Sequence, residues 1–259
     1  MVMNILICVK PVRSSIVYTQ EDRVEEYTIN PYDLLCLNKI LDIKNQYNFH
    51  ITVIAMGILG VKQVLTKCLA MGVDEAILLS DKEAFAGSDT VATVNVLAAA
   101  FQRINYDYIV MGAKSIDGET GQVKYGLAEK LHLECIENVI EILHIDAQNI
   151  KLEIDTSEST NIIKASGPLI ISYRDFTFVN GKVNLLRLKQ ANRKSITVWD
   201  CKDLNLDQNL CGMNGSKTKV VKLIPIEKQN NCVCIDDKID KANFIANLIN
   251  NYNGGNTVE

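Results

Sequence analysis

The sequence predicts an α/β fold built on a doubly wound, mostly parallel sheet. Continuous apolar runs, typical of strands covered on both faces, recur in the first half of the chain at residues 4–9, 51–55, 75–79 and 108–111. Segments with apolar residues at helical spacing separate these runs. Alternation of strands and helices with short connections implies right-handed crossovers, and hence a parallel sheet with helices on both faces. Such sheets bind ligands at the carboxyl ends of their strands.

Each helix expected in the first half has a recognisable beginning or end. Asn30, Pro31 and Asp33 supply a capping residue, a proline at the first helical position and an acid in the first turn. A second helix is expected over residues 60–71, ending at Gly72, because glycine can adopt a left-handed conformation. The other two are expected to begin at Ser88–Asp89, with Val91, Val94, Leu97 and Phe101 on one face, and at Glu119, with Val123, Leu127 and Leu131 inward.

The pattern changes after about residue 135. Short apolar runs between polar turns, at residues 140–143, 150–154, 162–165 and 169–173, predict additional strands that extend or flank the sheet. A polar, Asn-rich stretch follows Trp199, and residues 236–252 again have apolar side chains at helical spacing. We therefore expect residues 1–200 to form the α/β domain and residues 201–259 to form a C-terminal arm that packs on a partner subunit.

Composition excludes several classes of protein. The 259 residues carry 27 Lys and Arg against 31 Asp and Glu, a formal net charge of −4, without a basic run, so nucleic acid is not the expected partner. No apolar stretch is long enough for a transmembrane helix or a signal peptide, so we expect a soluble cytoplasmic protein without membrane insertion. The three histidines lack metal-site spacing, and the eight cysteines, which form no Cys-x-x-Cys pair, are expected to be reduced packing residues.

The segment with the most chemical information is Gly112 to Val123, which follows an expected buried strand and leads into an expected helix. Exposed amides and the helix dipole make such a junction an anion site. Glycines at 112, 118 and 121 allow a phosphate to approach the backbone, while Thr120 offers a hydroxyl and Gln122 an amide. Neither a P-loop nor a Gly-x-Gly-x-x-Gly motif is present, so a plain glycine-rich connection to a capped helix is the alternative.

Several strings in the sequence occur in the same order in one known family. They are Cys8–Val12, Asn30–Asp33, Ala55–Gly57, Phe85–Thr93 and, most specific, Asp117–Val123, whose sequence is Asp-Gly-Glu-Thr-Gly-Gln-Val. Residues 212–223 are similar to the beginning of the family's C-terminal arm. On these strings the chain resembles the β subunit family of electron transfer flavoproteins over nearly its whole length.

The resemblance implies an adenine-nucleotide site on the α/β domain and a heterodimer with an FAD-binding electron transfer flavoprotein α subunit. In that family the β subunit holds either AMP, as a structural nucleotide, or a second FAD that accepts electrons from NADH. Forms with the second flavin tend to carry Gly-x-Asp-Thr-x-Ala-Thr and Asp-Gly-Asp-Thr-x-Gln-Val, which residues 87–93 and 117–123 resemble. FAD is therefore expected, with AMP as the alternative and a flavoprotein dehydrogenase, such as an acyl-CoA dehydrogenase, as a further partner.

Carried over by position, the resemblance implies a cofactor site without catalytic or metal-ligating residues. The cofactor-binding residues are Cys8, Asn30, Pro31, Tyr32, Asp33, Met56, Gly112, Ala113, Lys114, Ser115, Ile116, Asp117, Gly118, Glu119, Thr120, Gly121, Gln122 and Val123, with Thr90 and Thr93 near the flavin. Simpler interpretations exist for several of them. Asn30 and Asp33 would only cap a helix, Cys8 would be a packed wall, and the threonines would be first-turn helix residues.

The sequence departs from the family pattern in two places. Lys124 and Tyr125 stand where the family usually has Gly-Pro, so the lysine either offsets Glu119 and binds phosphate or is solvated. Asp117 and Glu119 are themselves expected to face ribose or a backbone amide rather than phosphate. Residues 179–185 lack the prolines that usually precede the loop recognising dehydrogenases, although the basic segment 189–194 is present.

Three functions are thus compared. In the first, the chain is a flavoprotein β subunit that carries electrons between NADH or a dehydrogenase and an acceptor, either of the bifurcation type with FAD or as a simple shuttle with AMP. In the second, it is a non-redox, self-associating sensor that binds an adenine nucleotide without yellow colour. In the third, it is a paralogue that only supports an α subunit.

Overall fold

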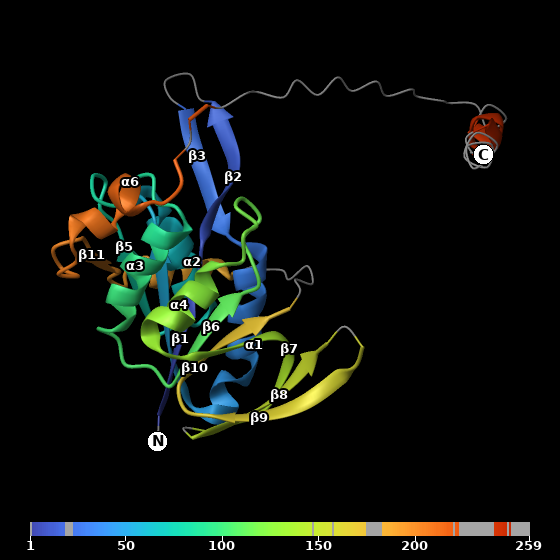
Figure 1. The fold of residues 1–259 in the computed structure, drawn as a ribbon, viewed down its shortest axis with the longest axis horizontal. Coiled ribbons are helices and arrows are strands. Elements are labelled where there is room, and N and C mark those ends of the chain that lie inside the picture. The colour runs from blue at the N-terminus through green and yellow to red at the C-terminus, as the bar shows by residue number, and fades with distance from the viewer. Residues whose placement is uncertain are drawn as a thin grey trace. The chain divides into compact units, whose positions relative to one another are not determined.

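The computed structural model describes residues 2–18, 23–146, 148–156, 158–174, 183–219, 221–222, 241–247 and 249. Within these residues a nine-stranded sheet has the order β11 (Thr197–Trp199), β5 (Glu75–Leu79), β4 (Phe49–Met56), β1 (Met3–Cys8), β6 (Tyr108–Gly112), β10 (Leu169–Tyr173), β7 (Glu134–Ile145), β8 (Asn149–Asp155) and β9 (Thr160–Ser166) (Figure 1). Neighbours from β11 to β7 are parallel, and β8 and β9 continue antiparallel. The prediction of a mostly parallel α/β sheet is confirmed.

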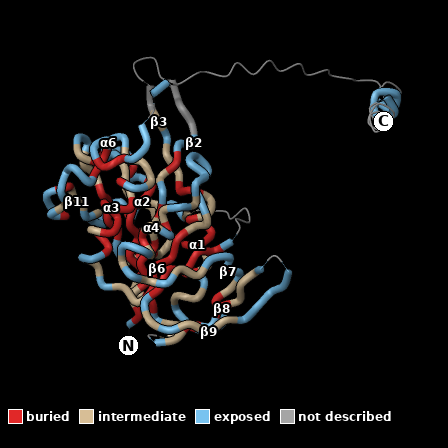
Figure 2. The backbone as a smooth tube through the Cα atoms, viewed as in Figure 1, coloured by how far each residue is buried: buried red, intermediate tan, exposed pale blue. Residues whose placement is uncertain are grey.

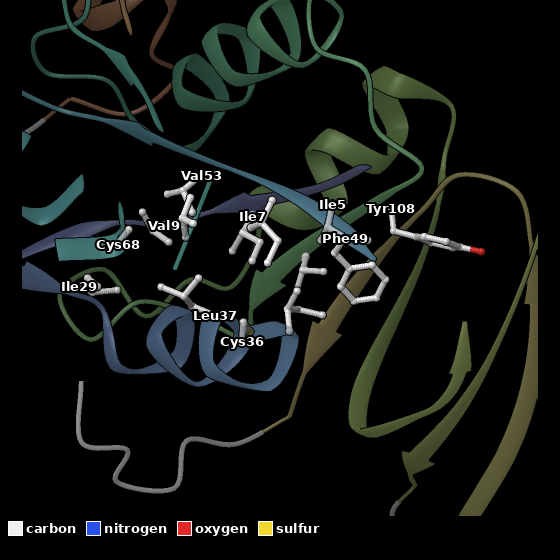
Figure 3. Close-up of a cluster of buried hydrophobic side chains, with 14 of the residues drawn as sticks. Ile5, Ile7, Val9, Ile29, Cys36, Leu37, Phe49, Val53, Cys68 and Tyr108 are labelled. Carbon is white, nitrogen blue, oxygen red and sulfur yellow. The ribbon is translucent and has the colours of Figure 1, made fainter. Parts of the chain in front are cut away.

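Four helices cover the two faces of the parallel strands. On one face, Ile5 and Ile7 of β1 share a buried cluster with Leu37 of α1 (Pro31–Tyr47) and residues of α2 (Lys62–Met71) (Figure 3). On the other face, Leu6 of β1 is buried with Phe101 of α3 (Thr90–Phe101) and residues of α4 (Val123–Leu131). Alternate residues of one strand thus face opposite layers, as strand geometry requires. Burial is concentrated in these central strands and helices (Figure 2).

The helix boundaries agree with the sequence except at α4. α1 begins directly after Asn30, α2 ends at Gly72, which has φ 127°, and Asp89 caps α3 by accepting from the Ala92 amide. α4 begins at Val123, four residues beyond the predicted start at Glu119. The reason is that Glu119 and Gly121 have φ values of 54° and 61°, in the left-handed region that a right-handed helix cannot contain.

The second half supplies the additional strands that its short apolar runs predict, β7 to β10, and β10 inserts between β6 and β7. Several elements were not predicted. They are the antiparallel hairpin of β2 (Pro11–Tyr18) and β3 (Arg23–Ile29), the short strand β11, α5 (Leu185–Ala191), the four-residue α6 (Gly212–Gly215), and the 3-10 turns η1 (Leu59–Val61) and η2 (Gln208–Leu210).

The chain divides into two units, Met1–Lys219 and Val220–Glu259. Cys201, Leu204 and Cys211, which the sequence analysis assigned to the arm, are buried in the core of the first unit. In the second unit, residues 241–247 are helical and exposed. Ile249 is also helical and exposed. The other residues of the predicted helix, and Cys232 and Cys234, lie outside the described residues. The six described cysteines are free, and no described helix is long and apolar enough to cross a membrane.

Candidate functional site

The chain reverses direction across the sheet between β1 and β6. β4 and β5 lie on one side of β1, and β6 and β10 lie on the other. Such a reversal opens a crevice at the carboxyl ends of the two strands, where open α/β sheets bind their ligands. Hydrogen bonds join residues 8–10, 30–33 and 112–116 at this edge. Three of the predicted cofactor segments are therefore in contact with one another.

Asn30 does not cap α1 with its side chain, contrary to the sequence prediction. The side chain turns to the loop after β6, where Nδ2 donates to the Lys114 carbonyl at 2.8 Å and Oδ1 accepts from the Ile116 amide at 3.2 Å. The Asn30 amide donates to the Lys10 carbonyl at 3.0 Å. Asn30 is only 1% exposed, so these bonds form away from water. One buried residue thus connects the loops after β1 and β6.

Asp33 bridges the same two loops from the first turn of α1. Oδ2 accepts from the Lys10 amide at 2.8 Å, and Oδ1 accepts from the Gly112 amide at 3.1 Å. Burial raises the pKa of Asp33 to about 7, although these amide bonds and the Lys10 charge oppose the shift. Position 112 has no room for a side chain, because a Cβ atom would lie 2.8 Å from Tyr32 Cβ and closer still to the Asp33 carboxylate.

Lys10 is a site residue that the sequence analysis missed. Its Nζ donates to Asp117 Oδ1 at 2.5 Å and to Ser115 Oγ at 3.3 Å, which closes the glycine-rich loop over the end of β1. Partial burial alone would raise the pKa of Asp117, but the bonds from Lys10, Ser115 and the Gly118 amide and the Lys10 charge together outweigh it, so that pKa lies below its usual value. The sequence signal was the position of Lys10 two residues after the end of β1, at the ligand edge.

Helix α4 begins without a side-chain cap. Gln122 occupies the N-cap position, and its side chain makes no bond to the first turn. Thr120 Oγ1 accepts from the Gln122 amide at 3.4 Å. Within the described part of the chain, the amides of Thr120 and Gly121 donate no hydrogen bond. These N–H groups, together with the positive end of the helix dipole, are available to an anion.

Lys124 is neither paired with Glu119 nor solvated, the two positions that the sequence suggested. Its side chain is 7% exposed, with Nζ 2.8 Å from the Ala113 carbonyl, to which it donates, and 3.7 Å from the Glu137 carboxylate. Nζ also lies 4.9 Å from the centre of the Tyr125 ring. Since the lysine is neither solvated nor paired with Glu119, it supports the backbone of the glycine-rich loop from inside the fold.

The remaining predicted residues lie at the same edge in different surroundings. Cys8 and Met56 end the neighbouring strands β1 and β4. Burial and the nearby Asp33 charge raise the pKa of the Cys8 thiol far above its usual value, so the thiol stays protonated. Thr90 and Thr93 occupy the first turn of α3, which packs against α4. No hydrogen bond in the described residues joins these threonines to residues 112–123.

The structure also has hollows away from this edge. One of about 480 Å³ is lined by residues 201–208, and one of about 430 Å³ lies between α1, α2 and α5. No residue predicted for the cofactor lines either of them. Neither hollow is therefore part of the candidate site.

Comparison with known proteins agrees with this geometry. The electron transfer flavoprotein domain model matches residues 19–204. The electron transfer flavoprotein β subunit of Clostridium acetobutylicum is 31% identical, covering 93% of this chain and 95% of the relative. Protein FixA of Azorhizobium caulinodans is 31% identical over 85% of this chain and 84% of its own. Subunit CarD of the caffeyl-CoA reductase-Etf complex of Acetobacterium woodii is 29% identical, covering 85% of this chain and 87% of the relative.

The family model covers residues 19–204, which include every strand of the nine-stranded sheet except β1 and the helices of both layers. Of the strings that suggested a resemblance, Cys8–Val12, Asn30–Asp33 and Asp117–Val123 are joined by hydrogen bonds between β1 and β6. The chain belongs to the electron transfer flavoprotein β subunit family.

Proposed function

We propose that this chain holds FAD in the crevice between β1 and β6, pairs with an FAD-binding α subunit, and carries electrons between NADH or a flavoprotein dehydrogenase and an acceptor. The observation that carries the proposal is the meeting of residues 8–10, 30–33 and 112–116 at the ligand edge of the sheet, in a chain of this family. With AMP in place of FAD, the same chain would be a simple shuttle.

The residues at this edge fit the phosphate part of an adenine nucleotide. The amides of Thr120 and Gly121 and the uncapped start of α4 are donors for an anion. Lys114 adds positive charge to this edge. Its side chain is exposed, and its Nζ lies 5.9 Å from the centre of the Tyr32 ring. Lys10 adds a second charge, which it shares with Asp117. AMP and FAD both carry a phosphate next to adenosine, so this donor set supports either.

Two features favour FAD over AMP. Residues 87–93 and 117–123 resemble the strings of family members with a second flavin. The first string also places two hydroxyl side chains, Thr90 and Thr93, on the first turn of α3, beside the layer that carries α4. AMP is too short to need these hydroxyl donors, whereas the additional ring system of FAD needs them.

A bound flavin supplies the redox chemistry, since it can accept a hydride from a nicotinamide and pass electrons on. The protein's own contribution is binding and orientation. Asn30 and Asp33 hold the two loops at a fixed separation, and the glycine backbone at position 112 permits this approach. The raised pKa of Cys8 supports a packing role for that thiol rather than electron transfer through it.

A dehydrogenase-type partner is part of the proposal. One relative, CarD, is named as a subunit of a caffeyl-CoA reductase complex. In this chain Leu185 and Leu186, at the start of α5, are 81% and 70% exposed, and Asn184 caps the helix by accepting from the Leu186 amide at 2.8 Å. Two exposed leucines on a capped helix suit an apolar contact with a flavoprotein such as an acyl-CoA dehydrogenase.

Nucleotide content tests the proposal directly. The chain is co-expressed with the FAD-binding α subunit, the purified complex is denatured, and the released nucleotides are identified and counted. Two FAD per heterodimer is the expected result. One FAD and one AMP would overturn the assignment of FAD to this chain and leave the shuttle. A stable complex without flavin would overturn both.

A matched pair of variants tests the site. Thr120→Val with Gln122→Ala removes two polar side chains at the start of α4, and we expect the nucleotide content of this subunit to fall at least tenfold. The control, Gln63→Ala with Thr66→Val, removes the same groups from α2, outside the predicted cofactor segments, and should leave that content unchanged. Equal nucleotide content in both double variants would show that the loop is not the site.

A further inference from the structure

The carboxylate of Asp89 gathers donors from two distant parts of the chain. Oδ1 accepts from the Ala92 amide at 3.0 Å and so caps α3. Oδ2 accepts from the Lys217 amide at 2.7 Å, the Thr218 amide at 2.9 Å and the Thr218 hydroxyl at 3.1 Å. A single side chain thus joins the start of a core helix to residues 128 and 129 positions further along.

A buried serine completes the connection. The Asp89 amide donates to Ser216 Oγ at 2.8 Å, and Ser216 is only 8% exposed. Ser216 Oγ also lies 2.6 Å from the Gly212 carbonyl and 3.0 Å from the Gly87 carbonyl. Beyond Ser216 the chain becomes exposed at once. Within the described residues, the only hydrogen bonds of Lys217 and Thr218 go to Asp89.

We propose that Asp89 is a positioning residue that fastens residues 216–218, the arm root, to the N-terminus of α3. Residues 220–259 continue the chain from this point, so the anchor fixes where they leave the first unit. The same carboxylate caps the helix whose first turn carries Thr90 and Thr93, so the arm root and these residues share one support. If the arm captures an α subunit, as the proposed function requires, that capture depends on the anchor.

The anchor is charged under all ordinary conditions. Burial alone would raise the pKa of Asp89, but the amides of Ala92, Thr218 and Lys217 and the Thr218 hydroxyl outweigh it and lower this pKa to about 2. An acid whose pKa is lowered on folding stabilises the folded state at every pH above its ordinary pKa, and this stabilisation is lost only as the pH falls toward about 2. The anchor is therefore permanent rather than a pH switch.

Amide hydrogen exchange on the full chain tests the anchor without any cofactor or partner. Asp89→Asn retains an oxygen for the Ala92 amide but presents an NH₂ group to the arm root in place of the acceptor Oδ2. We expect exchange at Lys217 and Thr218 to become at least tenfold faster, while exchange in α3 stays within twofold of the wild type. Thr218→Val, which removes only the hydroxyl donor, should give a smaller acceleration.

The matched control is Asp207→Asn, which removes the same charge from the same stretch of chain. Among the described residues, the Asp207 carboxylate accepts only from the Asn209 amide at its own turn, so exchange at Lys217 and Thr218 should not change. Unchanged exchange in Asp89→Asn, or equal acceleration in both variants, would overturn the anchor. If Asp89→Asn fails to fold, amide exchange in Thr218→Val alone tests the proposal. Exchange in the arm root of Thr218→Val at the wild-type rate would count against the anchor.

Retention of the α subunit tests the consequence separately. In size-exclusion chromatography at equal concentrations, Asp89→Asn is expected to retain the α subunit several-fold less than Asp207→Asn does. Faster exchange with full retention would overturn the link to partner capture while leaving the anchor intact. A wild-type chain that retains no α subunit would instead overturn the proposed function, and the exchange result would still decide the anchor.

Discussion

Asp33 is a buried carboxylate whose folded-state pKa, about 7, lies above its ordinary value of 3.8 because of desolvation. Ionisation therefore costs the folded chain more than the unfolded chain. The stability that the protonated Asp33 carboxyl group contributes is complete below about pH 4 and is lost as the pH rises through about 7. We predict that the free energy of unfolding of the wild type, relative to Asp33→Asn, falls from pH 5 to pH 8, with a limiting slope of about 1.4 kcal/mol per pH unit.

Urea unfolding of both proteins at four pH values in this window provides the measurement. Asp81→Asn serves as the control, because the amides of Ala84, Cys201 and Glu83 lower the pKa of Asp81, so it is already ionised throughout the window. The difference between the wild type and Asp81→Asn should be flat from pH 5 to pH 8. A flat difference for Asp33→Asn as well would contradict the assignment of the raised pKa.

Gly112 belongs to the same contact and gives a second prediction. A Cβ atom in Gly112→Ala would lie 2.8 Å from Tyr32 Cβ and 2.9 Å from the Tyr32 carbonyl carbon, inside the distances that real Cβ atoms occupy. Relieving this overlap must displace α1 or β6, so we expect a loss of about 1–3 kcal/mol in the free energy of unfolding. Gly60→Ala, whose nearest neighbour would be 3.5 Å away, should change that free energy by less than about 1 kcal/mol in chemical denaturation. Equal midpoints for the two variants would refute the close approach.

Among the elements, α4 offers a test that separates stability from binding. Its first turn has neither a side-chain cap nor an acidic residue. We predict that Gln122→Asp stabilises the nucleotide-free chain by about 0.3–1 kcal/mol, because a negative charge at a helix N-terminus is favourable. The same charge should repel a phosphate, so the variant should also contain less nucleotide.

The comparison variant for α4 is Gln63→Asp. α2 also begins without a side-chain cap or an acid in its first turn, so the stabilisation should be similar, whereas nucleotide content should not change. Thermal unfolding and analysis of released nucleotide measure the two effects. Increased stability without loss of nucleotide in Gln122→Asp would mean that the start of α4 does not face a phosphate.

The elements also explain how far sequence reasoning could go. The central strands were predictable because burial on both faces leaves an unbroken apolar run, as in β1 and β4. The hairpin β2–β3 was missed because its residues Arg13, Glu25 and Glu26 interrupt any such run. Glu119 looked like a helix start, but its positive φ is a property of the folded loop. No local pattern records that conformation.

For the site, local patterns located the loops but not their bonds. Asn30 stands at a typical capping position, yet its side chain bonds the Lys114 carbonyl and the Ile116 amide in the loop after β6, about 85 residues away. For Lys124 the sequence left a partner of Glu119 and phosphate or a solvated side chain as alternatives, and the lysine is instead buried against the Ala113 carbonyl. Both outcomes depend on tertiary neighbours, which spacing along the chain does not specify.

At the scale of the whole molecule, the two units differ in what holds them. Among the residues that the structure describes, the buried apolar clusters on both faces of the sheet draw their members from residues 3–211, and no described residue of 220–259 belongs to either cluster. Residues 241–247 are helical and exposed, with Phe244 and Ile245 45% and 56% accessible. An amphipathic segment with uncovered apolar side chains is suited to packing against another chain.

We therefore predict that a chain ending at Lys219 keeps a cooperative urea transition, with a free energy of unfolding within about 1 kcal/mol of the full chain, because surface segments outside a core contribute little to stability. The Asp89 contacts to Lys217 and Thr218 also survive in it. Association with the α subunit, measured by co-purification, should be lost. A shortened chain that unfolds without cooperativity would place part of the core in residues 220–259, and one that still binds the α subunit fully would remove the arm from the interface. Asp89→Asn loosens only the arm root, whereas the truncation removes the segment that follows it. An anchored arm therefore requires weaker binding of the α subunit by Asp89→Asn and no binding by the chain that ends at Lys219.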